Sequence, residues 1–521
     1  MTSTTVPIDL KSKAGRFTLI ATILASAIVF LDSTVVTVAI PSIQRDFSAA
    51  FSSMQWVGDA YFVTLTAFLL IGGSYGDLFG RKRAFVIGLV SFTLGSILCG
   101  SAPSIGFLIA ARAIQGLGGA LLIPSSLAII TATFGEEQRG RAIGIWAATS
   151  GLGAAVGPLV GGALIDAFSW RWIFYINIPL AIVTLLFARA QMPETRDESA
   201  VQHLSTASGA AAAVALGGGA YCLIQGPVDG FTNPRVLIAS VVAVISAFAY
   251  WYVERRAKQP MIPHGVFRNI RFTSVQVATL TIYFALNGVF VFIILGAQQI
   301  HHLSSLKAGA SLIPITSLLL LLSPTVGKVA GKIGPKIPIA AGALLCAIGV
   351  AIAAFWGPHE SYFTLLLPAL VVFGVGLSFI VAPITGAAVA SLGQRHAGVA
   401  SAVNNAVSRL AGLLAFAILP GISLVAFTPA LHQQISTIDI SSKQKASLLV
   451  NVDKQGGLEA PKGLSSDSAK QVTDAISEAF YRGYRLTLFC VAGVMLIGGI
   501  IALLFVGKPD ESLMQNQTPP L

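Results

Sequence analysis

The sequence predicts an all-α polytopic membrane protein, because of its composition and its repeated apolar runs. Of its 521 residues, 55% are hydrophobic and only 11% are charged, whereas a soluble chain carries roughly a quarter charged residues. Apolar runs of about 20 residues, the length that crosses a bilayer as a helix, recur from one end of the chain to the other. They lack the period-two alternation of a membrane β-barrel. A soluble protein and a barrel are therefore both disfavoured.

The apolar runs number fourteen, and the first is too long for a removable signal peptide, so it is expected to remain as a span. All four cysteines lie inside these runs, so neither a disulfide framework nor a metal site is expected, and no cofactor. The expected spans are 17–41, 54–75, 84–101, 105–131, 141–165, 170–188, 205–225, 235–253, 271–296, 308–327, 337–356, 361–390, 398–426 and 484–507.

Basic residues set the expected orientation, because cytoplasmic loops carry an excess of Lys and Arg. With the N-terminus inside, the short outer loops hold only Arg45, Arg171, Arg235 and Lys307, and most other basic residues fall in inner segments. Both termini are then cytoplasmic. One outer loop, 427–483, is long and rich in Ser, Lys, Gln and Asp. It is expected to be a solvated or partly disordered cap rather than a substrate-binding segment.

The connection between the second and third spans carries a distinctive pattern, GSYGDLFGRKRAF. Its glycines permit a tight turn and close helix approach, its aspartate can meet a helix N-terminus or a guanidinium, and its basic residues hold the loop at the inner surface. The spacing is more particular than that of an ordinary basic loop, and it strongly resembles the loop signature of the major facilitator superfamily. The residues given a conformational role here are Gly73, Asp77, Gly80, Arg81 and Arg83.

A degenerate copy of this pattern, GKVAGKIGPKIP, follows the tenth span and suggests that the second half of the chain repeats the first, as in transporters built from two bundles. The expected parts are an N-terminal six-helix bundle at 1–188, a linker with inserted helices seven and eight at 189–270, and a C-terminal six-helix bundle at 271–521. The C-terminal part includes the long outer loop.

Four further stretches narrow the resemblance: LDSTVVTVAIPSI, LIAARAIQGLGGALLIPSS, GLGAAVGPLVGGALID and SWRWIFYINIPL. Together and in this order they look like the fourteen-helix drug:proton antiporter branch of the superfamily, and the resemblance covers nearly the whole chain. It implies a major facilitator fold, with two six-helix bundles around a central cavity plus two extra central transmembrane helices. It also implies export of compounds in exchange for protons.

Asp32 interrupts the first apolar run, where a charged side chain costs about 3 kcal/mol on insertion scales and usually faces a cavity or a partner. Arg112, in the fourth span, lies at a depth from which it can pair with Asp32. Such a carboxyl can hold a proton in one state and release it in another, because a nearby cation and burial shift its affinity in opposite directions. The alternative is a permanent buried ion pair that only fixes helix packing.

Asp59 lies near the outer end of the second span. It is expected to be a second proton site, a recognition point for cationic substrates, or a water-exposed residue at the mouth. Between Arg255 and Ile438 the only acidic residue is Glu360, in an outer loop. Proton coupling therefore has no carboxylate to use in the second bundle, which leaves Asp32, Arg112 and Asp59 as the candidates.

The fifth span carries small residues at four-residue spacing, which let another backbone approach closely. Its proline favours a bend because it removes an intrahelical hydrogen bond. Small-residue spacing alone usually means ordinary packing, but this stretch resembles the antiporter motif of the family, which implies a pivot and seal between the bundles. The residues are Gly153, Gly157, Pro158, Gly161 and Gly162.

Arg409 is a cation deep in the thirteenth span. Contact with backbone carbonyls or extension toward the inner surface is preferred over an anionic substrate group or lipid phosphate as its partner. An apolar pocket with a few polar points would suit amphipathic substrates. With Arg409, the candidates for its wall are Trp56, Tyr61, Trp146, Tyr283, Asn287, Phe290, Asn404 and Asn405.

The function expected from these observations is proton-coupled export of hydrophobic or amphipathic small molecules, including drugs, across a bacterial cytoplasmic membrane. A dedicated exporter or translocator of a lipid or secondary metabolite is the alternative within transport. An enzyme or sensor is disfavoured, because no nucleophile–base pair, metal cluster or nucleotide-binding loop is visible in the sequence. Expected partners are the substrate, protons and the bilayer, not nucleic acid, and the chain is expected to work as a monomer.

Overall fold

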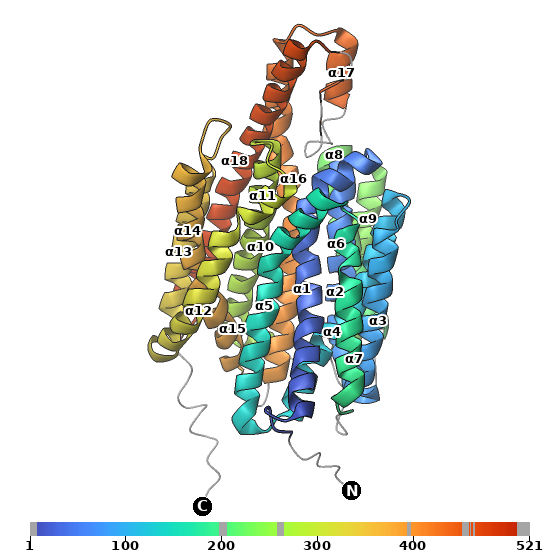
Figure 1. Cartoon of the computed structure of the whole chain (residues 1–521), viewed down its shortest axis with the longest axis vertical. Helices are drawn as coiled ribbons and strands as arrows, with labels where there is room; N and C mark the ends of the chain where they lie inside the picture. The colour runs from blue at the N-terminus through green and yellow to red at the C-terminus, as the bar shows by residue number, and fades with distance from the viewer. Residues whose placement is uncertain are drawn as a thin grey trace, which may run out of the picture.

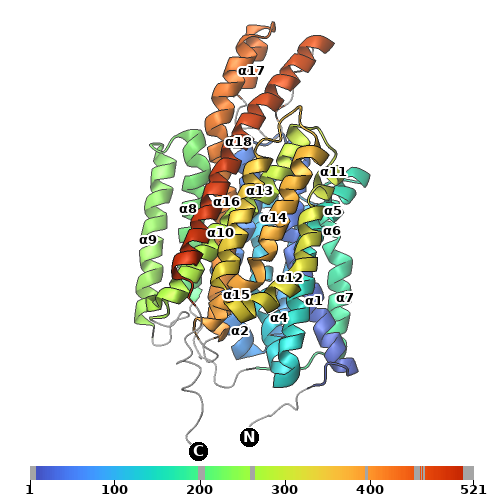
Figure 2. The ribbon, with the colours of Figure 1, turned by 90° about the vertical axis from the view of Figure 1, so that its left-hand side faces the viewer.

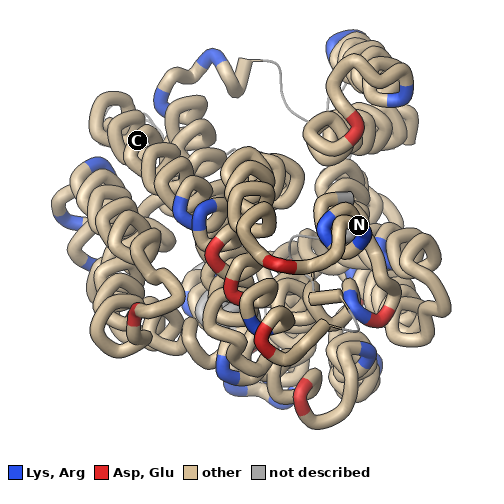
Figure 3. The backbone as a smooth tube through the Cα atoms, turned by 90° about the horizontal axis from the view of Figure 1, so that it is seen from above, with Lys and Arg blue, Asp and Glu red and all other residues tan. Residues whose placement is uncertain are grey.

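The computed structural model describes residues 8–196, 206–257, 265–392, 397–450, 458, 460, 461 and 464–507. Throughout this part the regular structure is helical, and the helices run mostly along the long axis of the molecule (Figure 1). Seen along that axis, most of the chain is neither acidic nor basic, and the charged residues are scattered (Figure 3). The predicted all-α membrane architecture is confirmed.

The first bundle contains six spans, the last of which is broken into two pieces. Its core contacts pair α2 with α4, α3 with α4, and α1 with α5 and α7. The helices are α1 (Lys13–Phe47), α2 (Phe51–Phe79), α3 (Arg81–Gly100), α4 (Ile105–Thr133), α5 (Glu136–Ala167), α6 (Trp172–Tyr175) and α7 (Asn177–Gln191).

Two helices separate the bundles in the sequence: α8 (Thr206–Asp229) and α9 (Pro234–Arg256). They are central in the sequence but lie at one side of the molecule (Figure 2). There α8 packs against α2 of the first bundle and α16 of the second, while α9 packs on α8. The inserted pair therefore bridges one edge of the junction between the bundles.

The second bundle follows a short 3-10 helix, η1 (Val266–Arg268), and again contains six spans, two of them broken. Here α10 packs on α16 and α18, and α13 packs on α14 and α18. The helices are α10 (Ile270–Gln299), α11 (Ser305–Ala310), α12 (Ile313–Ile333), α13 (Lys336–Ala353), η2 (Tyr362–Leu366), α14 (Leu367–Ser378), α15 (Val381–Ala390), α16 (Ala397–Ser436), α17 (Ser442–Val450) and α18 (Ser466–Phe505).

Each of the fourteen expected spans coincides with one helix or with consecutive helical pieces. Among the described residues, 13 helices or helix series are long and apolar enough to cross a membrane. The remaining expected span, 141–165, falls in the 32-residue helix α5. Helix α1 begins and α18 ends on the same side of the molecule, which we call the termini side; the opposite side is the far side (Figure 1).

The expectation of a solvated or partly disordered cap at 427–483 is wrong in part. Helix α16 continues to Ser436, α17 lies within the segment, and α18 begins at Ser466, so much of the segment is helical. The 40 residues of α16 and of α18 each span roughly 60 Å at 1.5 Å per residue, about twice the hydrocarbon thickness. Their ends therefore project beyond the other helices on the far side (Figure 1).

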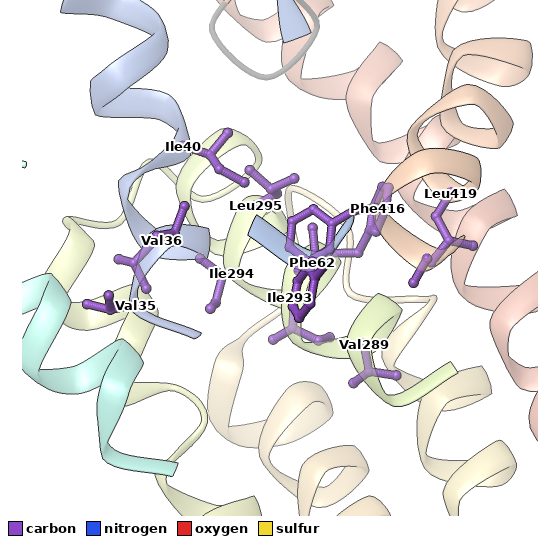
Figure 4. Close-up of a cluster of buried hydrophobic side chains, with 14 of the residues drawn as sticks. Val35, Val36, Ile40, Phe62, Val289, Ile293, Ile294, Leu295, Phe416 and Leu419 are labelled. Carbon is purple, nitrogen blue, oxygen red and sulfur yellow. The ribbon is translucent and has the colours of Figure 1, made fainter. Parts of the chain in front are cut away.

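The two bundles meet through apolar side chains on the helices nearest the molecular centre. Buried residues of α1 and α2, including Val36, Ile40 and Phe62, lie beside Ile294 of α10 and Phe416 of α16 (Figure 4). Gln55 adds a polar contact, because its Nε2 donates to the Phe416 carbonyl at 2.7 Å. Apart from Gln55, the side chains named here are apolar, and they form a surface along which the bundles could separate.

Candidate functional site

The structure brings Asp32 of α1 and Arg112 of α4 together inside the first bundle. Arg112 Nη1 donates to Asp32 Oδ2 at 2.5 Å. Asp32 is 0% exposed and Arg112 is 1% exposed. A buried ion pair is tolerated only when its remaining hydrogen-bonding groups are also satisfied. The neighbouring side chains decide whether this pair meets that condition.

Two amides complete the shell of the Asp32 carboxylate. Gln115 Nε2 donates to Asp32 Oδ1 at 2.8 Å, and Asn177 Nδ2 of α7 donates to the same oxygen at 3.2 Å. Asn177 also donates to Ser96 Oγ of α3 at 2.9 Å. The carboxylate thus receives hydrogen bonds from two helices besides α1, so a change in its protonation would act on the packing of α4 and α7 together.

The Arg112 guanidinium is held from several directions as well. Its Nε donates to the Val57 carbonyl at 3.0 Å and its Nη1 to Gln115 Oε1 at 2.7 Å. The Arg112 Cζ also lies 4.4 Å from the Tyr61 ring centroid, a cation–π contact. The pair is therefore enclosed by the first bundle and does not line the open cavity described below. Water or substrate reaches it only if the helices move.

Asp59 of α2 is placed differently. It is 0% exposed, and neither carboxylate oxygen accepts a hydrogen bond within the described part of the chain. One turn away, Gln55 reaches α16 and Trp56 lies 6.3 Å from Tyr221 of α8 between ring centroids. Asp59 is therefore buried near the place where α2, α8 and α16 meet. Of the three roles expected for it, that of a water-exposed residue at the mouth does not fit this conformation.

A cavity of about 430 Å³ opens between the bundles on the termini side. Its walls come from α2, α4 and α5 of the first bundle and from the first turns of α16 of the second. On the far side, the apolar junction and the packing of α5 on α11 join the bundles, and a separate cavity of about 520 Å³ lies between the last turns of α1 and α5 and the segment after α10 and the start of α18. The molecule therefore faces the termini side. Residues predicted from sequence that line the termini-side cavity are Gly73, Asp77, Arg81, Trp146 and Asn405.

The turn between α2 and α3 is held by its own charges. Arg81 Nη2 lies 2.7 Å from Asp77 Oδ1, so the aspartate meets a guanidinium, one of its two expected partners. Gly80 has φ +111°, which side chains rarely adopt. Glu194, after α7, accepts hydrogen bonds from the amides of Lys82 at 2.9 Å and Arg83 at 3.2 Å, so it caps the start of α3.

The small residues of α5 divide between two neighbours. A Cβ on Gly153 would lie 2.9 Å from the Ala27 carbonyl oxygen, and one on Gly157 would lie 3.1 Å from that of Leu31, so both face α1. Gly161 faces Val35 of the same helix. Across the bundle junction, Gly162 faces the Ser305 carbonyl of α11, and a Cβ on Gly309 of α11 would overlap the carbonyl of Pro158.

The remaining pocket candidates are spread over the second bundle. The Cζ of Arg409, on α16, lies 4.6 Å from the ring centroid of Phe30 on α1, so its guanidinium contacts the first bundle. Asn404 Oδ1 accepts from Thr279 Oγ1 at 3.0 Å, and Asn287 Nδ2 donates to the Tyr283 carbonyl at 2.7 Å. Phe290 packs against the apolar core. None of these five candidates lines the termini-side cavity within the described residues.

Sequence reasoning missed Gln115, Asn177, Glu194 and Asp166, the last of which accepts hydrogen bonds from the Ser305 and Leu306 amides of α11. Gln115 stands one turn after Arg112 on the same helix face, and Asn177 is an amide inside an apolar run, so both were detectable as buried polar residues. Glu194 and Asp166 stand outside or at the end of apolar runs. Their roles depend on contacts between distant segments, for which the sequence carries no local signal.

Comparison with known proteins gives a single family. The model described as the Major Facilitator Superfamily matches residues 22–416. Multidrug resistance protein Stp of Mycobacterium tuberculosis (strain CDC 1551 / Oshkosh) is 34% identical over 78% of this chain and 76% of its own length. Puromycin resistance protein pur8 of Streptomyces alboniger is 35% identical over 78% and 81%. The tetracenomycin C resistance and export protein of Streptomyces glaucescens is 28% identical over 95% and 92%.

Solved structures show the same fold at low sequence identity. A bacterial homologue of the human lysosomal transporter Spinster, in an inward-facing and occupied conformation, superimposes with a TM-score of 0.64 at 18% identity, covering 98% of this chain and all of that one. A bacterial homologue of the human drug peptide transporters PepT1 and PepT2 gives 0.61 at 14% identity, covering 97% of this chain. At these identities the likeness concerns the fold alone.

Proposed function

This chain belongs to the major facilitator superfamily and is a multi-pass membrane transporter, and from that premise we propose that it exports hydrophobic or amphipathic compounds, drugs among them, in exchange for protons. Support for the drug-export part comes from relatives named for multidrug and puromycin resistance. In the proposed orientation the termini side is cytoplasmic, in a bacterial cell membrane, and the chain works as a monomer.

The observation that carries the proton-coupled part is the buried Asp32 site. Its carboxylate joins α1 to Arg112 and Gln115 of α4 and to Asn177 of α7. A proton taken up by Asp32 removes the charge that holds the arginine and at least one of the acceptor positions used by the amides. Protonation would thereby loosen three helices at once, which is how one proton can favour a different arrangement of the bundle.

The proposed substrate enters from the termini-side cavity. Its wall is mostly apolar, with Trp146 as an aromatic residue, and its polar points are Ser74, Asp77, Arg81, Thr131, Ser401 and Asn405. A pocket of this composition suits compounds with a large apolar body and few polar groups. Asp59 is kept as a second candidate for proton exchange or for contact with a cationic group, because its buried carboxyl lacks a partner among the described residues.

The test uses purified protein in liposomes with a fluorescent amphipathic drug and an imposed pH gradient. Accumulation of the drug on the side that supplies protons, together with its loss when an ionophore collapses the gradient, is the expected result. Equal accumulation with and without the gradient would reject proton exchange while leaving transport itself in place.

The second candidate is export of one lipid or secondary metabolite. Two observations favour it: the tetracenomycin C export relative, which matches over 95% of this chain, and an apolar groove of about 750 Å³ between α8 and α16 that could take an acyl chain. Deletion of the gene separates the two candidates. Sensitivity to many unrelated compounds supports the multidrug exporter, whereas a single lipid or metabolite retained inside, without such sensitivity, supports the dedicated one.

A further inference from the structure

The far-side contact between α5 and α11 brings the backbones of the two bundles close together. A Cβ on Gly162 would overlap the carbonyl oxygen of Ser305, and one on Gly309 would overlap that of Pro158. At such a separation even a small outward tilt of one bundle breaks the contact completely. Because packed interfaces tend to switch between arrangements rather than deform continuously, this contact is expected to be either packed or broken.

Asp166, the penultimate residue of α5, adds a polar bond at this contact. Its Oδ1 accepts from the Ser305 amide at 3.1 Å and its Oδ2 from the Leu306 amide at 2.9 Å. The amides that open a helix have no partner within it. Here a carboxylate from the other bundle satisfies two of them, while Ser304 Oγ accepts from the Lys307 amide at 3.4 Å.

We propose that Asp166 is the far-side latch of the transport cycle: its carboxylate holds α11 while the molecule faces the termini side and releases it when the far side opens. In the proposed orientation this is the outer gate. The inference rests on the proposed export only in requiring that the far side opens. Asp166 acts through α11 and is a positioning residue that does not contact substrate.

The surroundings of Asp166 allow this bond to break repeatedly. The residue borders a cavity of about 520 Å³ on the far side, whose wall also includes Arg45 of α1 and His302, Ser304 and Ser477 of the second bundle. A carboxylate released from α11 would therefore enter a polar, hydrated space with a guanidinium nearby. Release of the bare charge into hydrocarbon would be strongly unfavourable, and the gate would then stay closed.

Asp46 provides a matched control. It is also a carboxylate at the far end of a first-bundle helix, and its Oδ2 accepts from Arg171 Nη1 at 2.8 Å and Trp170 Nε1 at 3.0 Å. Both partners belong to its own bundle. A general need for far-side carboxylates would make the two aspartates equivalent, whereas a latch between bundles makes only Asp166 matter.

The experiment measures the far-side distance by single-molecule fluorescence transfer. Dyes on Ser101→Cys and Glu360→Cys, exposed far-side positions on the first and second bundles, report opening in a background with Cys222 and Cys490 replaced by serine. Asp166→Asn keeps the size but loses the charge and one acceptor, so the ratio of open to closed molecules should rise about tenfold, which equals about 1.4 kcal/mol. Asp46→Asn should leave the ratio unchanged. This readout needs neither substrate nor gradient, so it is independent of the proposed function.

An unchanged ratio in Asp166→Asn, or an equal rise in Asp46→Asn, would overturn the latch. A covalent version covers the case in which Asp166→Asn does not fold. The pair Asp166→Cys with Leu306→Cys should stop transport on oxidation and regain it on reduction, while Asp46→Cys with Arg171→Cys, a crosslink within one bundle, should transport in both states. Full transport by the oxidised Asp166–Leu306 pair would show that this contact never opens, and would overturn the proposal.

Discussion

In the first bundle α3 and α4 meet at Gly88 and Gly118, and in the second bundle α13 and α14 meet in the same way at Gly342 and Gly376. A Cβ on Gly88 would lie 3.0 Å from the Gly118 carbonyl oxygen, and one on Gly342 would lie 2.5 Å from that of Gly376. The backbones therefore correspond. Their side chains do not, because counting back equally from Gly118 and Gly376 matches Arg112 with Leu370 and Gln115 with Phe373.

This difference in side chains indicates that the two bundles have different functions. The first bundle encloses a complete network of charge and amides around Asp32, and the second bundle fills the matching place with buried apolar side chains, Leu370 and Phe373. Apolar packing at this place is therefore sufficient for the fold. A buried ion pair is often no more stable than such packing, so its presence in the first bundle, without a counterpart at the matching place among the described residues of the second, is best explained by function.

The largest expected effect follows from breaking the network. Arg112→Leu, which copies the second bundle, leaves Asp32 buried without its cation, and losing one partner of a buried pair costs roughly 3–5 kcal/mol. The matched change Leu370→Met should cost less than about 1.5 kcal/mol. Denaturant unfolding of the purified variants measures both. Equal losses would mean that Arg112 serves only as packing.

The next effect concerns helix approach. Gly157→Leu places a side chain against Thr34 and the Leu31 carbonyl of α1, and such overpacking typically costs about 1–3 kcal/mol. Export should fall while the protein still reaches the membrane. Gly386 of α15 has open space around its Cβ position, so Gly386→Leu should export normally. Normal export by Gly157→Leu would show that the α5–α1 contact can yield without loss of function.

A smaller effect is expected where the α2–α3 turn is capped. Glu194→Gln keeps one oxygen for the amides of Lys82 and Arg83 but loses the charge that strengthens both bonds, a change of about 1–2 kcal/mol. The control is Glu360→Gln, which alters an exposed acid of the second bundle. Thermal unfolding of both variants gives the comparison, and an unchanged midpoint in Glu194→Gln would reject the capping role.

The smallest expected effect is a pH dependence of stability due to His301, which lies between α10 and α11. Burial lowers the pKa of His301 below its ordinary value of 6.5, and neighbouring His302 lowers it further, against a hydrogen bond with the Trp356 backbone that raises it. Because the pKa of His301 is lower in the folded protein than in the unfolded chain, the folded state is favoured when His301 is neutral. That stability is present above about pH 6.5 and is lost as the pH falls toward the folded pKa.

His301→Phe keeps the ring stacked on Trp356, 4.0 Å away between centroids, but does not titrate. The unfolding midpoint of this variant should change less between pH 7.5 and pH 5 than that of the natural protein. His359→Phe, at an exposed position, should keep the full pH dependence. Identical pH curves for His301→Phe and the natural protein would contradict the assignment.

Hydropathy located every span, because a length of apolar chain is a local property of the sequence, and the depth of Asp32 and Arg112 allowed their pairing to be foreseen. The far-side extensions of α16 and α18 were missed, because helices that leave the bilayer lose the hydropathy signal. A weaker signal was present in α18, where the buried residues Val472, Ile476, Phe480 and Gly483 recur at helical spacing. Which amides reach Asp32, and which segment Asp166 holds, depends on how distant helices dock.

The proposed proton exchange at Asp32 in the first bundle is tested by comparing transport by Asp32→Asn and by the natural protein in liposomes under an imposed pH gradient. Asparagine keeps the size and one acceptor oxygen but cannot titrate. Asp32→Asn should lose gradient-driven accumulation of the substrate but keep substrate binding and some passive exchange. Asp32→Glu should retain part of the accumulation. Normal accumulation by Asp32→Asn would contradict the proposed exchange at Asp32 and would leave Asp59 as the site of exchange.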